Sequence, residues 1–558
     1  MQLVAYGAQD VFLTGNPQIT FFKIVYRRHT NFAIESIEQT FTGTADFSRK
    51  VTCTIARSGD LITKMYLRVT LPQFDCGANG QWAWVSRIGH ALIDSVELEI
   101  GGTRIDKQYG DWLNIWNELA RNWAQDRGYN LLIGNTADLT TLNRVHNKTV
   151  LYVPLKFFSN RHDGLAIPLI ALQYHETKIN IEFKPRYECI VTSGNPVMDG
   201  LAISDSSLFV DYIYLDAEER KRFAQAQHEY LIEQLQFGGS EAINSVNQKF
   251  RLNFNHPCKA IYWALRLGKY THGYNFLVQS TGNTLSDRAN ASRRFVLACA
   301  AYQNTQNDAS GTIIPGTFNL VLVNGAVQPA VGLPANLLAK FQAINPVAVS
   351  TTAIASNISI LGTPLSIGDV STTTASLLEA VVGWARPTAQ TTQFAVGGAI
   401  AQAVDNQGTV NYDVKVTQWD NYGIYFDRTV NPIINVALTL NGHDRFSQRD
   451  GAYFNYVQPY QCHSNTPSDG INMYSFALNP EDHQPSGTCN FSRIDNATLS
   501  LNFGNPNDPT NPTYNANFFS DAEIDIFATN YNVLRIMSGM GGLAYSCLLY
   551  TSPSPRDS

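Results

Sequence analysis

Charged side chains are scarce in this sequence. Asp, Glu, Lys and Arg make up 15% of its 558 residues, against about 25% in ordinary soluble proteins. Hydrophobic residues reach 44%, so Asn, Gln, Ser, Thr and Gly replace the missing charge. A weakly charged polar surface suits a protein that contacts copies of itself, although ordinary β-sandwich composition explains it equally well. The net charge of −6 argues against a nucleic-acid-binding protein, which usually presents a basic face.

Paired cysteines and long apolar segments are also missing. Because no Cys-x-x-Cys pair occurs, there is no recognisable zinc site and no disulfide framework, and we expect reduced thiols. No segment reaches the roughly 20 apolar residues of a membrane span, and residues 1–9 lack the basic start and apolar core of a signal peptide. We therefore expect a soluble chain. The eight cysteines are Cys53, Cys76, Cys189, Cys258, Cys299, Cys462, Cys489 and Cys547.

Catalytic motifs are absent as well. The sequence contains no GxxxxGKS/T, HExxH or GxSxG motif, and we predict no enzyme activity, no cofactor and no metal site. Two clusters, His443-Asp444-Arg445 and Glu481-Asp482-His483, could pair a carboxylate with an imidazole. Neighbours on a strand point to opposite faces, so we favour structural hydrogen bonding for both. We interpret Arg445 and Arg493 as anchors between strands or subunits, because a guanidinium can hold two acceptors at once.

Five Asn-x-Ser/Thr sequons are possible glycosylation sites. They matter only if the chain meets a glycosylation machinery, and nothing else in the sequence suggests that it does. The sequon asparagines are Asn147, Asn290, Asn357, Asn490 and Asn496.

The most informative stretch is Ile433–Phe503. It opens with apolar residues at every second position and closes on the alternating Leu499–Phe503, a pattern that predicts β-strands. Asn441-Gly442 tolerates positive φ and predicts a sharp turn after the first strand. Ile93–Gly102 repeats this first strand and turn 340 positions earlier, and Ile179–Phe183 repeats the closing strand 320 positions earlier.

Two further pairs of segments extend the repeat. Tyr212–Leu215 resembles Tyr531–Leu534 at a separation of 319 residues, and Ile37–Phe41 resembles Ile232–Phe237 at 195. Four echoes in the same order predict one β-domain that is used twice. The separation grows from 195 to 340, so we predict an insertion of 145 residues (340 − 195) in the second copy, before Ile433.

Two segments of the first half stand apart from this strand pattern. Residues 1–31 form an arm whose apolar part is Phe21–Tyr26. Such a run at a terminus docks on another molecule or packs on its own domain, which is the interpretation we favour. The helical spacing of Asp111–Leu119 places Trp112, Ile115, Trp116 and Leu119 on one face. We expect that face to close one end of a sandwich rather than to bind a ligand.

Three further segments lie outside the repeat. The charged run Ala217–Ala224 contains good helix formers and predicts an exposed or interface helix that joins the two halves. The insertion, roughly 269–412, is poorly charged but rich in β-branched residues, so we expect a folded excursion on a loop rather than disorder. Residues 547–558 (CLLYTSPSPRDS) resemble translated sequencing-adapter DNA, and we exclude them from the fold. Between 295 and 404 the charged residues are Asp308, Lys340, Asp369, Glu379 and Arg386.

Six blocks of this sequence closely resemble the major capsid proteins of nucleocytoplasmic large DNA viruses. They span most of the chain except the insertion and the last twelve residues. The most specific contain LNGHDRFSQRDGAYFNYVQPYQ and PLIALQYHETKINIEF. The blocks are Leu98–Leu119, Pro168–Phe183, Glu218–Phe237, Leu440–Gln461, Ile471–Leu499 and Asn530–Ser546.

The resemblance implies an all-β fold of two tandem eight-stranded antiparallel jelly rolls. It implies an arm at 1–31, a first jelly roll at 32–216, an inter-domain linker at 217–240 and a second jelly roll at 241–546, with the insertion 269–412 as an outer tower. It also implies a homotrimeric, pseudo-hexagonal capsomer that tiles the icosahedral shell of a large double-stranded DNA virus.

The partners implied by the resemblance are neighbouring capsomers, minor capsid proteins and penton proteins. The arm would lie on the inner side near an internal membrane, without direct contact to nucleic acid, and assembly would take place in the host cytoplasm. Two other readings of the sequence stay open. A β-sandwich glycan-binding attachment protein could use the insertion as an adhesion surface. A β-sandwich hydrolase would need two carboxylates about 5–10 Å apart, and no sequence pair suggests them.

Overall fold

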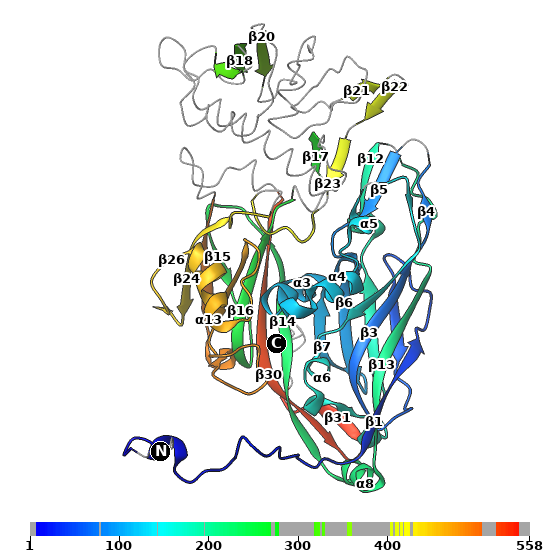
Figure 1. The fold of residues 1–558 in the computed structure, drawn as a ribbon, viewed down its shortest axis with the longest axis vertical. Coiled ribbons are helices and arrows are strands. Elements are labelled where there is room, and N and C mark those ends of the chain that lie inside the picture. Colours follow the sequence, from blue (N-terminus) through cyan, green and yellow to red (C-terminus); the bar gives the residue numbers. More distant parts are fainter. Residues whose placement is uncertain are drawn as a thin grey trace, which may run out of the picture.

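The computed structural model of this chain contains two antiparallel sandwiches in tandem (Figure 1). It describes residues 7–77, 80–141, 143–194, 196–268, 418–424, 428–504 and 521–545, together with short strands between 274 and 416. Apart from those strands, the predicted insertion 269–412 lies outside the described residues, as do the tail 547–558 and Cys299. Within the described part of the chain, no helix is long and apolar enough to cross a membrane.

The first sandwich consists of two antiparallel sheets built from residues 32–215. The first sheet has the order β1 (Phe32–Thr40), β13 (Asp205–Leu215), β3 (Leu61–Leu71), β10 (Ile167–Pro168), with β9 (Thr149–Pro154) also on β3. The second has the order β2 (Lys50–Thr54), β11 (Thr177–Phe183), β6 (Ile93–Ile100), β7 (Thr103–Tyr109). The four repeated segments of this half all lie in strands, β1, β6, β11 and β13, because their alternating side chains place one apolar row in the core.

The second sandwich repeats this arrangement. One sheet has the order β14 (His228–Ala242), β30 (Glu523–Met537), β16 (Pro257–Arg266), β27 (Ile471–Ser475), with β28 (Cys489–Asn490) on β16 and β31 (Met540–Leu543) on β30. The other has the order β15 (Asn247–Arg251), β29 (Ala497–Phe503), β24 (Ile433–Leu440), β25 (His443–Asp444), with β26 (Arg449–Asp450) on β24.

The strand orders confirm the internal repeat read from the sequence. Each pair of echoing segments occupies the same place in its sheet: β1 and β14 at one edge, β13 and β30 next to them, β11 and β29, and β6 and β24. The turns match too. Gly101 and Gly102 have φ of 59° and 82°, and Asn441 and Gly442 have φ of 50° and 79°. Positive φ at both central residues is the geometry of a two-residue hairpin turn.

A glycine after each hairpin completes the repeat. Gly110 begins the helix α3 (Gly110–Leu119), and Gly451 begins the helical segment 451–462. A Cβ on Gly110 would lie 2.3 Å from the carbonyl oxygen of Ile93, and a Cβ on Gly451 would lie 1.9 Å from that of Ile433. Ile93 and Ile433 are the equivalent first residues of β6 and β24. Both helices therefore need a residue without a side chain where they approach the strand.

Short helices connect the strands at the ends and sides of the sandwiches (Figure 1). The predicted helix at 217–224 is present as α8 (Ala217–Gln225), at the base of the molecule. The range 217–240 divides between α8 and β14, because the alternating residues from His228 onward pair with β30. The other helices are α1 (Val11–Thr14), α2 (Ile88–Ala91), α4 (Asp126–Leu132), α5 (Ala137–Thr140), α6 (Phe158–Arg161), α7 (Arg186–Cys189) and α13 (Gln458–Cys462), with the 3-10 turns η1 (Trp123–Gln125), η2 (Asp163–Leu165), η3 (Leu169–Ala171) and η5 (Phe491–Arg493) and the π-helical turn η4 (Tyr453–Val457).

Strands from both ends of the insertion join a sheet of the first sandwich. β17 (Tyr274–Leu277) and β23 (Asp413–Val416) pair with each other, and β23 also pairs with β12 (Ile190–Gly194), which pairs with β5 (Gly80–Trp84). The insertion thus leaves the second half of the chain but is anchored on the first half. The remaining strands are β4 (Phe74–Asp75), β8 (Val145–His146), β18 (Thr317–Val323), β19 (Ala326–Pro329), β20 (Ile354–Ser359), β21 (Gln402–Asp405) and β22 (Gly408–Asn411).

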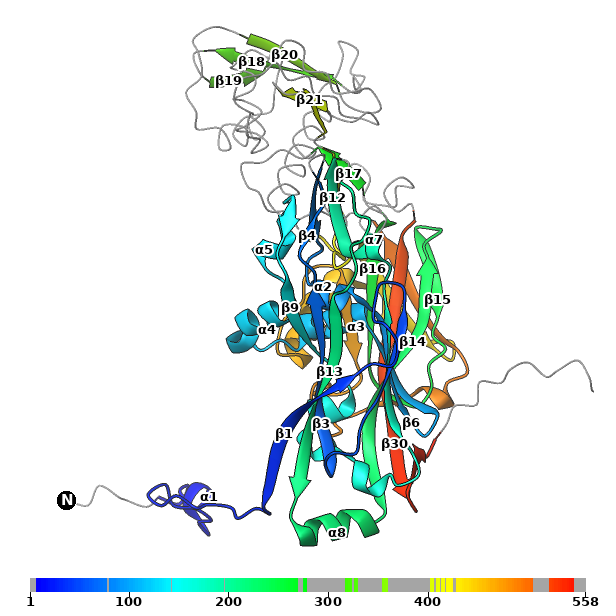
Figure 2. The same cartoon turned by 90° about the vertical axis from the view of Figure 1, so that its right-hand side faces the viewer.

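The arm does not pack on its own domain, so the interpretation favoured from the sequence is wrong. Residues 7–31 leave the base of the first sandwich and run away from the body in both views (Figures 1 and 2). The side chain of Phe22 is 99% exposed, and all residues from Phe21 to Tyr26 are exposed. Within the described residues, the apolar side chains of the arm therefore stay exposed.

Candidate functional site

The two sandwiches meet at a junction of packed aromatic side chains and buried ion pairs. Its centre is α3, whose four apolar residues do share one face, as predicted. That face does not close the end of its own sandwich. It packs on the outer face of the β16–β30 sheet of the second sandwich, where the ring centroids of Trp112 and Tyr262 are 5.1 Å apart and those of Trp112 and Phe527 are 5.5 Å apart. The helix therefore joins the two sandwiches.

Strand β16 shows why this contact is possible. All its residues except the two terminal ones are buried. Ile261, Trp263 and Leu265 face the core of the second sandwich, and the intervening Tyr262 and Ala264 face α3. A strand that is apolar on both faces needs cover on both sides. The first sandwich supplies the second cover.

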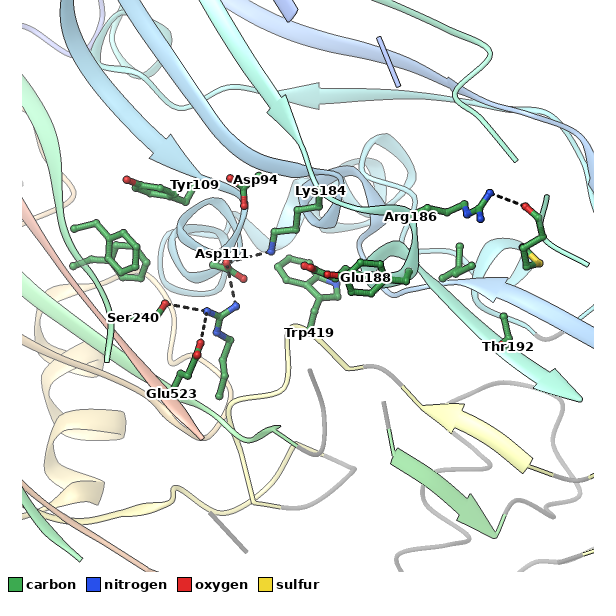
Figure 3. Close-up of a pocket in the computed structure, with 16 residues that line it drawn as sticks. Asp94, Tyr109, Asp111, Lys184, Arg186, Glu188, Thr192, Ser240, Trp419 and Glu523 are labelled. Atoms are coloured by element: carbon green, nitrogen blue, oxygen red, sulfur yellow. Dashed lines mark hydrogen bonds and ion pairs between the residues drawn. The ribbon is translucent and has the colours of Figure 1, made fainter. Parts of the chain in front are cut away.

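A cavity of about 710 Å³ opens beside α3 and is lined by residues of both sandwiches (Figure 3). On one wall the Asp111 carboxylate accepts from the Lys184 ammonium at 3.4 Å and from the Arg266 guanidinium at 3.4 Å. Arg266 Nε lies 2.9 Å from the Asp525 carboxylate, which also accepts from the Ser240 hydroxyl. Lys184 and Asp111 come from the first sandwich, and the other three residues come from the second.

Charges in this wall are balanced in pairs. Burial alone would raise the pKa of Asp111, but Lys184 and Arg266 outweigh it and hold that pKa below its usual value. Burial keeps the pKa of Asp525 above its usual value, although Arg266 opposes this. Each carboxylate is paired with at least one cation. The pair between Asp111 and Arg266 crosses from one sandwich to the other and links the two domains.

A second ion cluster crosses the junction nearer the base. Glu233 of β14 accepts from Lys259 Nζ of β16 at 2.7 Å and from Arg161 Nη1 of α6 at 2.7 Å. The Lys259 side chain is fully buried, and that of Glu233 is 7% exposed. Burial opposes ionisation of Glu233, but the hydrogen bond from His483 and the charges of Arg161 and Lys259 lower its pKa to about 2. Burial lowers the pKa of Lys259 as well.

The Glu481–His483 cluster predicted from the sequence belongs to this second ion cluster. Glu481 accepts from His463 Nδ1 at 2.8 Å and from the Ser464 backbone N–H at 2.7 Å. The Asp482 carbonyl oxygen accepts from Lys259 at 3.0 Å. These are structural hydrogen bonds, as expected. Glu233 and Lys259 could not be found from sequence patterns, because their link to this loop depends on contacts between segments more than 200 residues apart.

The other residues singled out in the sequence lie on the surface. Asp444 accepts from the Thr439 hydroxyl at 2.9 Å, a local structural bond within a hairpin. The side chains of His443, Arg445 and Arg493 are exposed. No group of three or more His, Cys, Asp or Glu side chains in the described residues could hold a metal ion.

The sequons divide between exposed and undescribed positions. Asn147, Asn490 and Asn496 are exposed, and their glycosylation stays a prediction. Asn290 lies outside the described residues, and Asn357 is placed only as part of β20.

A third cluster ties the chain that follows the insertion to the first sandwich. The Asp420 carboxylate accepts from the Ser86 hydroxyl at 2.8 Å and pairs with Arg428 at 2.7 Å. Trp419 Nε1 donates to the Ser86 carbonyl oxygen at 2.7 Å. Burial opposes the charge of Arg87, but Glu118 and Asp420 outweigh it and raise its pKa above the usual value. The segment that follows the insertion is therefore held on the first sandwich before the chain continues into β24 of the second sandwich.

Exposed aromatic side chains flank the junction on the outside. Loop 463–468 is hydrogen-bonded to the end of α3. The Asn465 backbone N–H donates to the Leu119 carbonyl oxygen at 3.0 Å, and the Asn465 side-chain amide donates to the Arg121 carbonyl oxygen. Trp123 follows α3 and Tyr460 belongs to α13, which precedes this loop, and the two side chains are 69% and 83% exposed. Leu131 and Tyr456 are also exposed. We call Trp123, Leu131, Tyr456 and Tyr460 the seam patch, a set of exposed apolar side chains from both sandwiches that is available for contact with another molecule.

Comparison with known proteins identifies the family to which this architecture belongs. Residues 20–216 match the family described as major capsid protein N-terminus, and residues 219–362 and 365–542 match large eukaryotic DNA virus major capsid protein. The major capsid protein of Phaeocystis pouchetii virus is 43% identical, with 98% of this chain and 99% of that protein covered.

Solved structures give the same answer. The crystal structure of PBCV-1 VP54 is 33% identical, with a TM-score of 0.60 over 94% of this chain and 100% of that one. A quasi-atomic model of the PBCV-1 virus capsid is 32% identical, with a TM-score of 0.58 over the same shares. These neighbours are double jelly rolls, as expected from the resemblance. The chain therefore belongs to the family of major capsid proteins of large eukaryotic DNA viruses.

Proposed function

We propose that three copies of this chain form a capsomer with a pseudo-hexagonal outline, and that these capsomers tile an icosahedral shell. The observation that carries the proposal is the repetition of one strand order in two sandwiches that α3 and two ion clusters fix side by side. Three such pairs around an axis present six similar units, and one repeated lateral contact then suffices for a flat layer.

The domain division follows from the same repeat. The first jelly roll is 32–216, and the second extends to 546 and starts at β14, before the residue 241 expected from the sequence. The insertion 269–412 forms a tower on the outer surface, and the base with α8 and the arm faces inward. In this orientation the base lies near minor capsid proteins and an internal membrane. Penton proteins are further partners in the assembled shell. The chain acts as a structural protein of the virion shell that assembles in the host cytoplasm, without catalysis and without direct contact to nucleic acid.

The seam patch is the surface we assign to contact within the trimer. A ring of three copies uses a heterologous contact, in which one surface meets a different surface of the next copy. Stable obligate interfaces bury on the order of several thousand Å² and place aromatic side chains at their centre. Tyr460 and Trp123 supply such side chains beside a rigid junction.

Light scattering on the purified full-length chain tests the trimer. The expected particle mass is about three times the 61.9 kDa of one chain, and negative-stain images should show hexagonal arrays. Tyr460→Asp should convert trimers to monomers, because a carboxylate would be buried without a partner. Val197→Asp, at a 59% exposed position on another part of the first sandwich, is the matched control and should leave the trimer intact. A wild-type protein that remains monomeric at assembly concentration would refute the proposal.

A further inference from the structure

The arm combines exposed apolar side chains with positive charge. Nine large apolar residues of the arm are at least two-thirds exposed, and residues 11–34 contain Lys23, Arg27 and Arg28 but no Asp or Glu. Apolar groups at this density need cover from another surface. The nine residues are Val11, Phe12, Leu13, Ile19, Phe21, Phe22, Ile24, Val25 and Tyr26.

A second uncovered apolar surface lies at the end of the body from which the arm departs. We call Tyr174, Met537 and Met540 the base patch, and they are 75%, 41% and 51% exposed. Met537 and Met540 face each other across the two-residue turn that joins β30 and β31. Methionine side chains adapt to irregular partners, which favours binding of an extended segment.

The base patch is held in a fixed shape. The turn residues Ser538 and Gly539 both have positive φ, as a tight hairpin requires. Tyr174 N donates to the Gly539 carbonyl oxygen at 3.0 Å, and a Cβ on Gly539 would lie 2.6 Å from the Tyr174 ring. His175 Nδ1 lies 3.1 Å from Gly541 N. These contacts hold the hairpin against the first sandwich. Binding of a partner therefore costs little conformational entropy in the hairpin.

The arm and the end of β30 lie on opposite sides of the base (Figure 2). The nine residues between Phe22 and β1 span at most about 30 Å when extended. In a tiled layer every copy stands the same way up, so the arm of one copy runs at the level of the bases of its neighbours. An arm on one side and a receptor surface on the other is the arrangement of a head-to-tail contact.

We propose that residues 19–26 of one copy dock on the base patch of a second copy. Phe21 and Phe22 cover Tyr174 and the two methionines. The basic residues that follow lie near Glu176, whose carboxylate is 63% exposed and lies 3.4 Å from the half-buried Lys178 ammonium. The inference rests on the proposed assembly, because it needs copies that stand side by side.

Cysteine cross-linking between distinguishable copies tests this contact. Full-length Phe22→Cys and isotope-labelled full-length Met540→Cys are mixed, assembled and oxidised, and the cross-links are read by mass spectrometry. The expected product joins the two variants, in isolated trimers or in arrays, at least tenfold above the control pair. That pair is Phe22→Cys with Leu478→Cys, since Leu478 is 77% exposed on the second sandwich. Each single variant, oxidised alone, measures the cross-links that form with the native cysteines, and these are subtracted.

Three outcomes would overturn the arm contact. The first is no excess of the mixed product in trimers and arrays that have formed normally. The second is a cross-link within one copy of a Phe22→Cys/Met540→Cys double variant at high dilution. The third is an arm that is protected from protease only when lipid vesicles or other virion proteins are added. Loss of the wild-type trimer in light scattering would instead count against the proposed assembly, so the two failures are distinguishable.

Discussion

Glu233 should contribute far more to stability than its neighbour on the same strand, Glu229. Glu233 bridges the buried Lys259 and Arg161, whereas Glu229 pairs with Arg535 on the surface at 2.8 Å, with side chains 58% and 49% exposed. Lowering the pKa of Glu233 from 4.5 to about 2 corresponds to about 3 kcal/mol in favour of the folded, ionised state. Exposed pairs contribute about 0–1 kcal/mol.

Glu233→Gln removes the charge and keeps the shape. The new amide offers one acceptor oxygen where the carboxylate offers two, and its NH₂ group must face a cation. Removing one partner of a buried ion pair costs about 3–5 kcal/mol, in agreement with the value from the pKa. Glu229→Gln is the matched control and should cost less than about 1 kcal/mol. We expect the two variants to differ by at least about 2 kcal/mol.

Hydrogen exchange of the β14 amides measures the free energy of local opening without assuming that the whole chain unfolds in one step. Protein concentration must be equal in all samples, because assembly shifts apparent stability. The sign of the pH dependence is a second readout. A lowered pKa stabilises the fold above about pH 4.5, and this stabilisation is lost as the pH falls towards 2. The difference between wild type and Glu233→Gln should therefore shrink over that range. Equal costs for Glu233→Gln and Glu229→Gln would refute the reasoning.

Three other substitutions test the junction and the repeat. Burial raises the pKa of Asp106 to about 6, although the N–H groups of Leu235 and Lys107 and the Gln108 amide donate to its carboxylate, so the wild type loses stability as the pH rises through 6. Asp106→Asn should lack this loss, and in urea unfolding the stability of the variant relative to wild type should rise by up to about 3 kcal/mol between pH 4 and pH 8. Trp112→Ala should cost about 3–5 kcal/mol, and exchange should increase first in α3 and β16; exchange confined to other elements would contradict its role. Gly442→Ala should cost about 1–2 kcal/mol through positive φ alone, since a Cβ there meets no neighbour within 4 Å. Gly128 is equally open but has an ordinary helical φ, so Gly128→Ala should increase the free energy of unfolding by about 0.5–1 kcal/mol. Thermal unfolding of both variants measures the difference.

Local sequence patterns were enough to predict the strands, the turn and the repeat. Alternation of apolar residues with period two is a local property, and it placed β6, β11, β24 and β29 correctly. Asn441-Gly442 predicted its turn because only a few residue types tolerate positive φ. One local signal was overlooked. Gly110 and Gly451 follow the two hairpins at nearly the same spacing as the other echoes, 341 residues (451 − 110), and both mark a close approach of helix to strand.

Which residues meet across the junction could be seen only in the folded chain. Glu233 finds Arg161 and Lys259 through strand pairing between segments far apart in sequence, and no spacing rule connects them. The sequence showed the apolar face of α3 but not its partner, because a helix face specifies burial and not the surface that covers it. The arm shows the reverse case. Its apolar residues predicted burial, yet they stay exposed in the described part of a single chain, because a local apolar run does not specify the surface that covers it.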